Sequence, residues 1–382
     1  MIEVNEKSQC CGCAACVDRC PVNCISLRED EEGFCYPYVD NEVCVSCGLC
    51  TRVCPVLNRS IEKRPLCQYA ALNPDMSIRS SSSSGGLFSI LARYVIDKGG
   101  VVFGASFDES WNVHHNMVST VDDLSALRGS KYVQSDSRNI YLEVERQLKS
   151  DKMVLFSGTP CQVAALRLYL GREYPGLLCV DVICHGVPSP RIWRDYLVKL
   201  GDLRPVGTQL VGISFRDKVG GWKEFNFTVK FGDGSQLSES HEDNCYMKGF
   251  LRDIYLRPSC YDCPAKAGRS GSDITLGDYW GIQDAHPEMD DDMGVSVVLL
   301  NSEKGLELFE SLDCDKVATS YDAVVRANPS LIYSVNKPFR RDEMFKAILN
   351  NGVGTVNREL RKTKRLNSLL KRWNRLTSAI WK

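Results

Sequence analysis

The cysteines are the sequence feature that most limits what this chain can fold into. The chain has 382 residues and 19 cysteines, and 12 of these lie between Cys10 and Cys67. The N-terminus lacks the apolar core of a signal peptide, and no run approaches the length of a membrane span, so we expect a chain that is not secreted. Disulfide frameworks are rare in such proteins, and an odd cysteine total argues the same way. We therefore expect reduced thiols that serve mostly as metal ligands.

Two short segments repeat one cysteine spacing. Residues 10–21 read CCGCAACVDRCP, residues 44–55 read CVSCGLCTRVCP, and both match C-x2-C-x2-C-x3-C-P. In two-cluster ferredoxins, three cysteines of such a run bind one 4Fe-4S cubane and the fourth binds the other. The predicted ligands of cluster one are Cys10, Cys13, Cys16 and Cys54. The predicted ligands of cluster two are Cys44, Cys47, Cys50 and Cys20.

The alternative interpretation of these repeats is a pair of zinc knuckles. A zinc site takes four ligands, usually as two separated pairs, which does not explain eight cysteines in two identical runs. Residues 22–40 contain two short apolar strands around the turn 30–33, as the twofold repeat of a ferredoxin requires. We therefore predict a ferredoxin domain over residues 1–60. Cys11, Cys24 and Cys35 fall outside the spacing and are expected to be small buried residues.

The rest of the chain alternates strand-like and helix-like segments. Strands are expected near residues 67–72, 101–105, 153–156, 177–183, 211–215, 225–231, 273–277 and 295–300, and helices over 87–98, 137–149, 160–170, 189–200 and 302–312. Ser137 and Thr159 are the expected N-caps of two of these helices. The predicted fold class is α+β and multidomain: the ferredoxin module, a mixed α/β flavin-binding body in two parts (66–150 and 151–330), and a basic helical C-terminal tail (331–382).

Two loops have the composition of anion-binding loops. Residues 80–86 read SSSSSGG and precede a helix, and residues 157–160 read SGTP and follow a strand. Hydroxyl groups and free amides at a helix N-terminus favour an anion or the edge of a flavin, although a serine run is more often a solvated linker. Neither loop matches the dinucleotide or ATPase phosphate-binding motifs, so nicotinamide or ATP binding has no support.

Four of the later cysteines stand at turns. Cys161 ends a Gly-Thr-Pro-Cys turn, Cys184 precedes His185 and Gly186, and Cys260 and Cys263 form a C-x2-C. Four thiols at loop positions could bind one more cluster. The alternative is a scatter of core cysteines together with half of a zinc site.

Five motifs in order resemble the family of the coenzyme F420 hydrogenase/dehydrogenase beta subunit. They are SSGG at 83–86, GSKYVQS at 129–135, GTPCQ at 158–162, CHG at 184–186, and the C-x2-C at 260–263 followed by DITLGDYWG at 273–281. The resemblance extends from about residue 67 to about residue 328. It implies an oxidoreductase that holds FAD and 4Fe-4S clusters and passes electrons between the clusters and a hydride acceptor.

The resemblance also implies site residues. A third cluster would be bound by Cys161, Cys184, Cys260 and Cys263. The implied FAD contacts are Ser83, Ser84, Gly85, Gly86, Lys131, Tyr132, Gly158, Thr159, Asp278 and Trp280. Lys131 would stabilise the anionic reduced flavin by its charge, unless it is an ordinary surface lysine. His185 would donate a proton or merely orient a cluster ligand, and Asp278 could instead cap a turn.

The C-terminal tail is strongly basic. Residues 357–382 contain nine Lys or Arg and one acid, Glu359. Apolar residues recur on one helical face at Leu366, Leu369, Leu370, Trp373, Leu376 and Ile380. Such a helix could lie on the inner face of a membrane, or pack on the body or on another protein of a complex. The whole chain has 47 Lys and Arg against 48 Asp and Glu, which gives no reason to expect a nucleic-acid partner.

The leading hypothesis is therefore a cytoplasmic iron-sulfur flavoprotein oxidoreductase. A ferredoxin or another redox protein would exchange electrons with the N-terminal clusters, and electrons would pass through the third cluster to FAD. The flavin would serve a small-molecule hydride acceptor, coenzyme F420 or another substrate, because flavins convert between one- and two-electron chemistry. The alternatives are a non-catalytic electron-transfer subunit that serves a partner enzyme, and a redox sensor with labile clusters.

Overall fold

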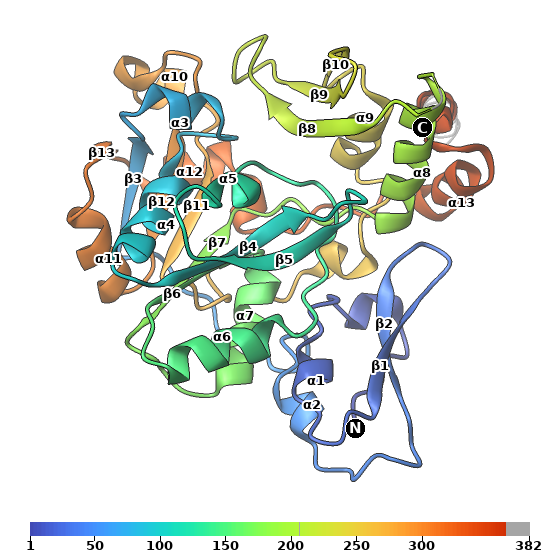
Figure 1. Ribbon diagram of the computed structural model, residues 1–382, viewed down its shortest axis with the longest axis vertical. Helices are drawn as coiled ribbons and strands as arrows, with labels where there is room; N and C mark the ends of the chain where they lie inside the picture. The colour runs from blue at the N-terminus through green and yellow to red at the C-terminus, as the bar shows by residue number, and fades with distance from the viewer. Residues whose placement is uncertain (206, 364–382) are drawn as a thin grey trace, which may run out of the picture.

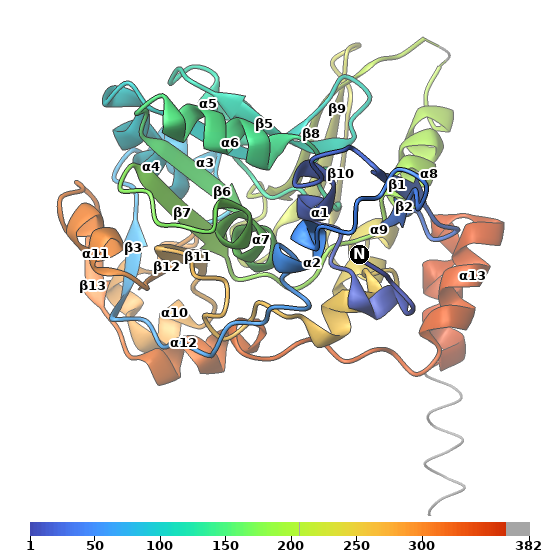
Figure 2. The same cartoon turned by 90° about the horizontal axis from the view of Figure 1, so that it is seen from below.

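A computed structural model describes residues 1–205 and 207–363 and has a mixed α/β, multidomain architecture, as predicted (Figures 1 and 2). A small N-terminal module lies against a larger body, which contains an eight-stranded sheet and a three-stranded sheet. Over the described residues, none of the helices combines the length and apolar character that crossing a bilayer requires.

The N-terminal module consists of two short helices and one hairpin. The helices α1 (Ala15–Asp18) and α2 (Leu49–Arg52) each lie inside one of the cysteine runs and pack against each other. The strands β1 (Ile25–Glu29) and β2 (Cys35–Val39) pair antiparallel between the two runs. This is the pair of strands that the sequence predicts, and the helix pair brings the two cysteine runs together.

The body is centred on a sheet with the order β13-β3-β12-β11-β7-β6-β4-β5. Its strands are β3 (Cys67–Leu72), β4 (Val101–Phe107), β5 (Val113–Val118), β6 (Val154–Gly158), β7 (Leu177–Val182), β11 (Ile274–Asp278), β12 (Ser296–Leu300) and β13 (Asp315–Ala318). Strands β4, β6, β7 and β11 are parallel. Strand β3 runs the same way, because β3 and β11 are both antiparallel to β12. The carboxyl ends of five strands therefore meet at one edge.

Helices cover both faces of this sheet. Helices α4 (Leu87–Asp97) and α11 (Glu303–Glu310) pack on one face, and α6 (Ile140–Lys149) and α7 (Pro160–Leu170) pack on the other. Central strands read as runs of buried apolar residues because neither face meets water. The shorter helices of the body are α3 (Met76–Ser80), α5 (Leu124–Leu127), α10 (Ile282–Ala285) and α12 (Tyr321–Ala327), with 3-10 turns η2 (Pro258–Asp262), η3 (Pro287–Met289), η4 (Pro329–Leu331) and η5 (Val353–Thr355). The 3-10 turn η1 (Lys7–Gln9) belongs to the N-terminal module.

The small sheet has its own aromatic core. Strands β8 (Leu210–Asp217), β9 (Asn226–Phe231) and β10 (Gln236–Ser240) pack with α8 (Pro190–Asp202), α9 (Cys245–Leu251) and α13 (Arg341–Asn351). Trp193 and Tyr246 lie at its centre with ring centroids 5.1 Å apart. Both views show α13 beside α8 (Figures 1 and 2), and Phe345 of α13 is buried in this core. The predicted apolar stripe from Leu366 to Ile380 lies outside the described residues.

The predicted cap of α6 is wrong. The helix begins at Ile140, and its cap is the carboxylate of Asp18 in the N-terminal module, which accepts hydrogen bonds from the backbone N–H groups of Asn139 (2.9 Å) and Tyr141 (3.3 Å). Ser137 instead accepts a hydrogen bond from the side chain of Gln162 at 2.7 Å. The cap is supplied from a distant part of the chain, so a local sequence pattern does not reveal it.

We expect Asp18→Ala to lower the free energy of unfolding by about 1–2 kcal/mol, because two N–H groups at the start of α6 lose their acceptor. Thermal unfolding of anaerobically prepared protein measures this loss. Asp75→Ala is the matched control, since Asp75 caps α3 within the body. Only Asp18→Ala should also speed proteolysis at residues 58–66, between module and body. Equal proteolysis of the two variants would contradict a cap that joins the two parts.

Candidate redox site

The motif loops of the body gather at one edge of the large sheet. The serine-glycine loop follows β3 and the short helix α3, the Gly-Thr-Pro-Cys loop follows β6, the Cys-His-Gly loop follows β7, and the Asp-Tyr-Trp segment begins at the last residue of β11. These four strands run in the same direction, so their carboxyl ends lie together. Open α/β sheets bind their ligands at this edge, and the N-terminal module packs nearby.

The predicted ligands of cluster two surround one hollow. Cys20, Cys44, Cys47 and Cys50 all line a space of about 330 Å³. The backbone N–H of Ile2 donates to the sulfur of Cys50 at 3.2 Å, and the N–H of Cys24 donates to the sulfur of Cys20 at 3.3 Å. Cys47 is exposed. The four sulfurs therefore border one space near the surface, with N–H groups already aimed at two of them, as cluster sulfurs require.

The predicted ligands of cluster one are also close together. Burial raises the pKa of the Cys16 thiol above its usual range, and the neighbouring Cys10 and Cys54 raise it further. Cys13 is buried and lies beside Cys16 and Cys10. Buried thiols ionise only where a cation balances the charge, so this arrangement suits iron ligands.

The four later cysteines converge although they come from three separate loops. Burial raises the pKa of Cys184 to about 12, and Cys161 and Cys263 are among the groups that raise it further. The pKa of Cys260 is raised by burial and also by the nearby Cys184 and Cys263. The structure thus brings together all four residues for which the sequence predicts a third cluster.

A single metal ion fits none of these sets in the part of the chain that the structure describes. No three His, Cys, Asp or Glu side chains among residues 1–205 and 207–363 converge on one ion position. In a 4Fe-4S cubane, by contrast, each cysteine binds a different iron atom, so its ligands need not converge on a point.

Two buried cations beside the later cysteines were missed by sequence reasoning. The ammonium of Lys266 donates to the carbonyls of Cys184 (2.6 Å) and Ser330 (2.5 Å). Arg257 is fully buried at the junction of module and body. Each stands three positions from a cysteine of the C-x2-C, which is the only local signal, and an isolated cation in a loop is ordinarily solvated.

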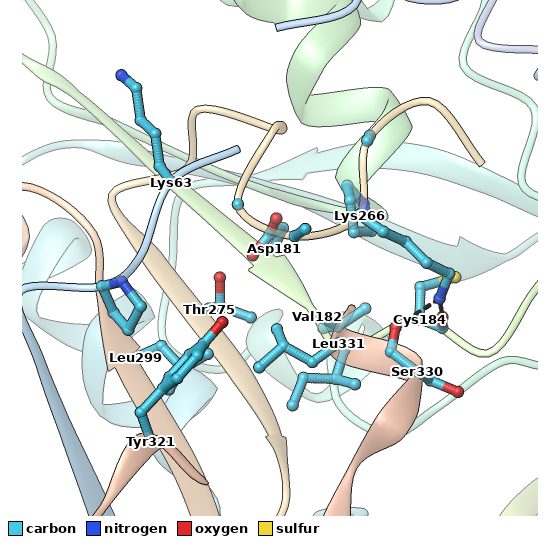
Figure 3. A pocket seen from close by; sticks show the side chains of 16 residues that line it. Lys63, Asp181, Val182, Cys184, Lys266, Thr275, Leu299, Tyr321, Ser330 and Leu331 are labelled. Carbon is cyan, nitrogen blue, oxygen red and sulfur yellow. Dashed lines mark hydrogen bonds between the residues drawn. The ribbon is translucent and has the colours of Figure 1, made fainter. Parts of the chain in front are cut away.

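A hollow of about 400 Å³ lies next to Cys184 and Lys266 (Figure 3). Asp181 of β7 and Thr275 of β11, which are partners in the strand pairing, both line it. Asp181 is buried, and its Oδ1 has no hydrogen-bond partner among the described residues. Burial raises the pKa of Asp181 to about 6, although nearby hydroxyl groups lower it.

We expect Asp181→Asn to stabilise the protein at neutral pH. The folded-state pKa of about 6 exceeds the unfolded value of 3.8, so the wild type loses stability as the pH rises from 3.8 to about 6, and the full loss, at most about 3 kcal/mol, is present at neutral pH. The gain in melting temperature should be larger at about pH 7.5 than at about pH 4, where the carboxyl is also partly protonated in the unfolded chain and little of this loss has developed.

Asp273→Asn is the matched control for this experiment. Asp273 is equally buried, but its carboxylate pairs with Arg167 (2.9 Å) and accepts from the backbone N–H of Cys179 (2.8 Å). Its substitution should therefore destabilise at both pH values. A loss of stability in Asp181→Asn at pH 7.5 would contradict the assignment of Asp181 as an unsatisfied buried acid.

The serine-glycine loop is held by specific contacts that a solvated linker would not make. Ser84 donates to the carbonyl of Val295 at 2.9 Å, and the N–H of Gly85 donates to the hydroxyl of Ser296 at 3.0 Å. A Cβ on Gly85 would lie 2.6 Å from the carbonyl oxygen of Ala71, so only glycine permits this approach. Gly86, with φ of 82°, is the N-cap residue of α4.

Lys131 lies in the loop that contacts the serine-glycine loop. The hydroxyl of Ser83 accepts from the N–H of Ser130 at 2.7 Å, which joins the two loops. The Lys131 ammonium donates only to the carbonyls of Arg128 (3.1 Å) and Gly129 (3.3 Å), without a carboxylate partner in the described residues. Burial lowers its pKa to about 7. The neighbouring Tyr132 stacks on Phe250 with ring centroids 4.6 Å apart.

Asp278 and Trp280 connect the two sheets rather than cap a turn. Asp278 accepts from Arg216 at 3.1 Å and from the indole N–H of Trp222 at 3.0 Å. Trp280 stacks parallel to Trp222 with ring centroids 4.9 Å apart. Arg216 belongs to β8 and Trp222 to the segment that follows it, so this cluster fixes the small sheet against the edge of the large sheet.

Three other predicted residues lie at the same edge. Gly158 is the last residue of β6, and Thr159 is the N-cap of α7 as predicted, with its hydroxyl 3.2 Å from the sulfur of Cys161. The ring nitrogen Nε2 of His185 lies 2.6 Å from Oδ1 of Asp253. His185 is therefore oriented by a carboxylate, next to a predicted cluster ligand.

Two family models match this chain. Residues 151–323 match the C terminus of the coenzyme F420 hydrogenase/dehydrogenase beta subunit, and residues 9–58 match the 4Fe-4S dicluster domain. The chain thus combines one region that matches a 4Fe-4S dicluster domain with another that matches the C terminus of the coenzyme F420 hydrogenase/dehydrogenase beta subunit. This confirms the resemblance drawn from the five motifs and from the cysteine runs.

Individual relatives agree with both parts. One of the subunits of the F420H2 dehydrogenase of Methanosarcina mazei is 24% identical over 210 residues, which cover 50% of this chain and 58% of that protein. A 7Fe ferredoxin of Hydrogenibacillus schlegelii is 49% identical over 43 residues, which cover 11% of this chain and 49% of that protein. The chain spans little more than half the length of the first of these. A chain from a xenon derivative of the F420-reducing NiFe hydrogenase complex of Methanosarcina barkeri aligns with a TM-score of 0.47 and 17% identity over 79% of this chain and 94% of that one.

Proposed function

We propose that this chain is an iron-sulfur flavoprotein oxidoreductase. It would exchange electrons with a ferredoxin or another redox protein, hold three 4Fe-4S clusters and FAD, and serve a small organic hydride acceptor such as coenzyme F420. The observation that carries the proposal is the convergence of Cys161, Cys184, Cys260 and Cys263 at the sheet edge that also holds the predicted flavin loops, directly against the ferredoxin domain.

The junction supports a continuous path between the ferredoxin domain and the body. The thiol of Cys11 is buried and interacts with Cys13 on one side and Cys161 on the other. Cys13 is a predicted ligand of cluster one, and Cys161 is a predicted ligand of the third cluster. Only one side chain therefore separates the predicted ligand sets of these two clusters.

The residues proposed for FAD suit an anionic, partly apolar group. Lys131 has its ammonium held by backbone carbonyls and no acid beside it in the described chain, so its charge is available to a phosphate or to the reduced ring. The N-terminus of α4, an eleven-residue helix, begins at the serine-glycine loop, where the helix dipole favours an anion. When bound, FAD would supply the conversion between one- and two-electron chemistry.

A second candidate function is a non-catalytic electron-transfer subunit that serves a partner enzyme. One observation favours it: Val43 and Val45, beside the exposed Cys47, are 47% and 60% exposed. An apolar rim around a predicted cluster is suited to docking another redox protein. Both candidates share the clusters, and they differ in whether the flavin reaches a substrate of this chain.

Quantification of iron, sulfide and flavin after anaerobic purification tests the proposal. We expect about twelve iron atoms per chain, from three cubanes of four irons. Cys263→Ala should lose about four of them, and Cys314→Ala, which changes a cysteine outside all three sets, should lose none. Eight irons in the wild type would exclude the third cluster, and a lack of flavin would exclude the flavoprotein.

Lys131→Met should lower the flavin reduction potential or the flavin content, because the reduced ring loses its nearby positive charge. Lys131→Arg keeps the charge and should retain both properties. A spectroscopic redox titration of the flavin measures the effect. Flavin properties unchanged in Lys131→Met would remove this residue from the site. A fully loaded wild type that reduces no acceptor with an artificial donor would favour the second candidate.

A further inference from the structure

Arg257 is a fully buried cation where the ferredoxin domain meets the body. Its Nε donates to the carbonyl of Cys10 at 2.7 Å, its Nη1 to the side chain of Gln134 at 2.9 Å, and its Nη2 to the carbonyl of Cys35 at 2.9 Å. Two of these acceptors belong to the ferredoxin domain and one to the body. The guanidinium is therefore clamped between the two parts.

None of these acceptors carries a charge, and Arg257 forms no ion pair within the described ranges 1–205 and 207–363. A buried charge without a counter-charge costs several kcal/mol. The other groups that face it are the rings of Phe34 and Tyr36, with centroids 5.3 and 4.5 Å from the guanidinium carbon, and the thiols of Cys10, Cys11 and Cys260. Only the cysteines and what they bind could supply the missing negative charge.

Two of those cysteines belong to different predicted clusters. Cys10 is a predicted ligand of cluster one, and Cys260 is a predicted ligand of the third cluster. The backbone of Arg257 is part of the loop that carries Cys260, since the N–H of Cys260 donates to the carbonyl of Arg257 at 2.9 Å. The guanidinium therefore binds the loop of one ligand set, while the backbone of Arg257 belongs to the loop of the other.

The close approach to cluster one depends on a glycine. Gly12 has φ of 71°, and a Cβ there would lie 2.6 Å from Nη1 of Arg257 and 2.3 Å from the side-chain nitrogen of Gln134. The ligand loop can approach the guanidinium only because this residue has no side chain. Glycine at position 12 therefore leaves the space that the side chain of Arg257 occupies.

A second buried arginine at the same junction shows the contrast. Arg341 also joins the body to the ferredoxin domain, but it pairs with Glu32, with 2.7 Å between Nη2 and Oε2. Its charge is balanced within the protein. Lys266 is another buried cation near the third cluster, and it faces Cys184 and Cys263. Of these two cations, Arg257 is the one that also faces cluster one.

We propose that Arg257 supplies the positive charge that raises the reduction potentials of cluster one and the third cluster above that of cluster two. A cubane gains one negative charge on reduction, so a nearby buried cation favours the reduced state. Electrons that enter at cluster two, near the surface, would then move downhill to the junction. The part that concerns the third cluster rests on the proposed function, whereas the part that concerns cluster one needs only the dicluster domain.

The test is a redox titration of the full chain, monitored by electron paramagnetic resonance, for the wild type, Arg257→Met and Arg257→Lys. Signals are assigned with Cys47→Ala and Cys263→Ala. We expect Arg257→Met to shift cluster one and the third cluster to lower potential and to leave cluster two nearly unchanged. Arg257→Lys should keep both potentials close to the wild-type values because it keeps the positive charge. The double variant Arg341→Met/Glu32→Gln removes a balanced pair from the same junction and should shift none of them.

Unchanged potentials in Arg257→Met, equal shifts of all three clusters, or an equal shift in the double variant would overturn the proposal. Arg257→Met could lose iron, in which case the iron content of Arg257→Lys decides. Iron retained in Arg257→Lys supports the proposal, because this variant keeps the positive charge. Iron lost from both variants overturns the proposal. Eight irons in the wild type would remove the third cluster from the proposed function, but the shift of cluster one would still decide the role of Arg257.

Discussion

The organisation of this protein depends on the polar junction between the ferredoxin domain and the body. Asp18 caps a helix of the body, the Arg341–Glu32 pair crosses the junction, and Arg257 binds the backbone of the ferredoxin domain and the side chain of Gln134 in the body. Buried polar groups of this kind are costly unless every partner is in place. They therefore hold the two parts in one relative position, and electron transfer between clusters needs such a fixed separation.

The topology of the large sheet explains how distant motifs form one site. Five strands run in the same direction, so the loops that follow them emerge at a single edge, where open α/β sheets bind ligands. The small sheet closes this edge through Asp278 and Arg216. Predicted flavin residues and predicted third-cluster ligands thus lie at the same edge of the large sheet, although they come from widely separated parts of the sequence.

Local patterns could be predicted from the sequence, and contacts between distant segments could not. The cysteine spacing, the alternating strands and helices, and Thr159 ahead of Pro160 depend on neighbours in the chain, and the structure agrees with them. The cap by Asp18, the buried Arg257 and the unsatisfied Asp181 depend on residues far away in the chain or on burial itself. Charged residues are usually solvated wherever they stand in the chain, so the sequence carries no sign that these three are buried.

We propose that a third iron-sulfur cluster links the ferredoxin domain to the flavin loops. Anomalous diffraction at the iron absorption edge, from crystals grown without oxygen, tests it most directly. We predict three iron peaks per chain, two within residues 1–60 and one among Cys161, Cys184, Cys260 and Cys263. Two peaks, both in the ferredoxin domain, would contradict it.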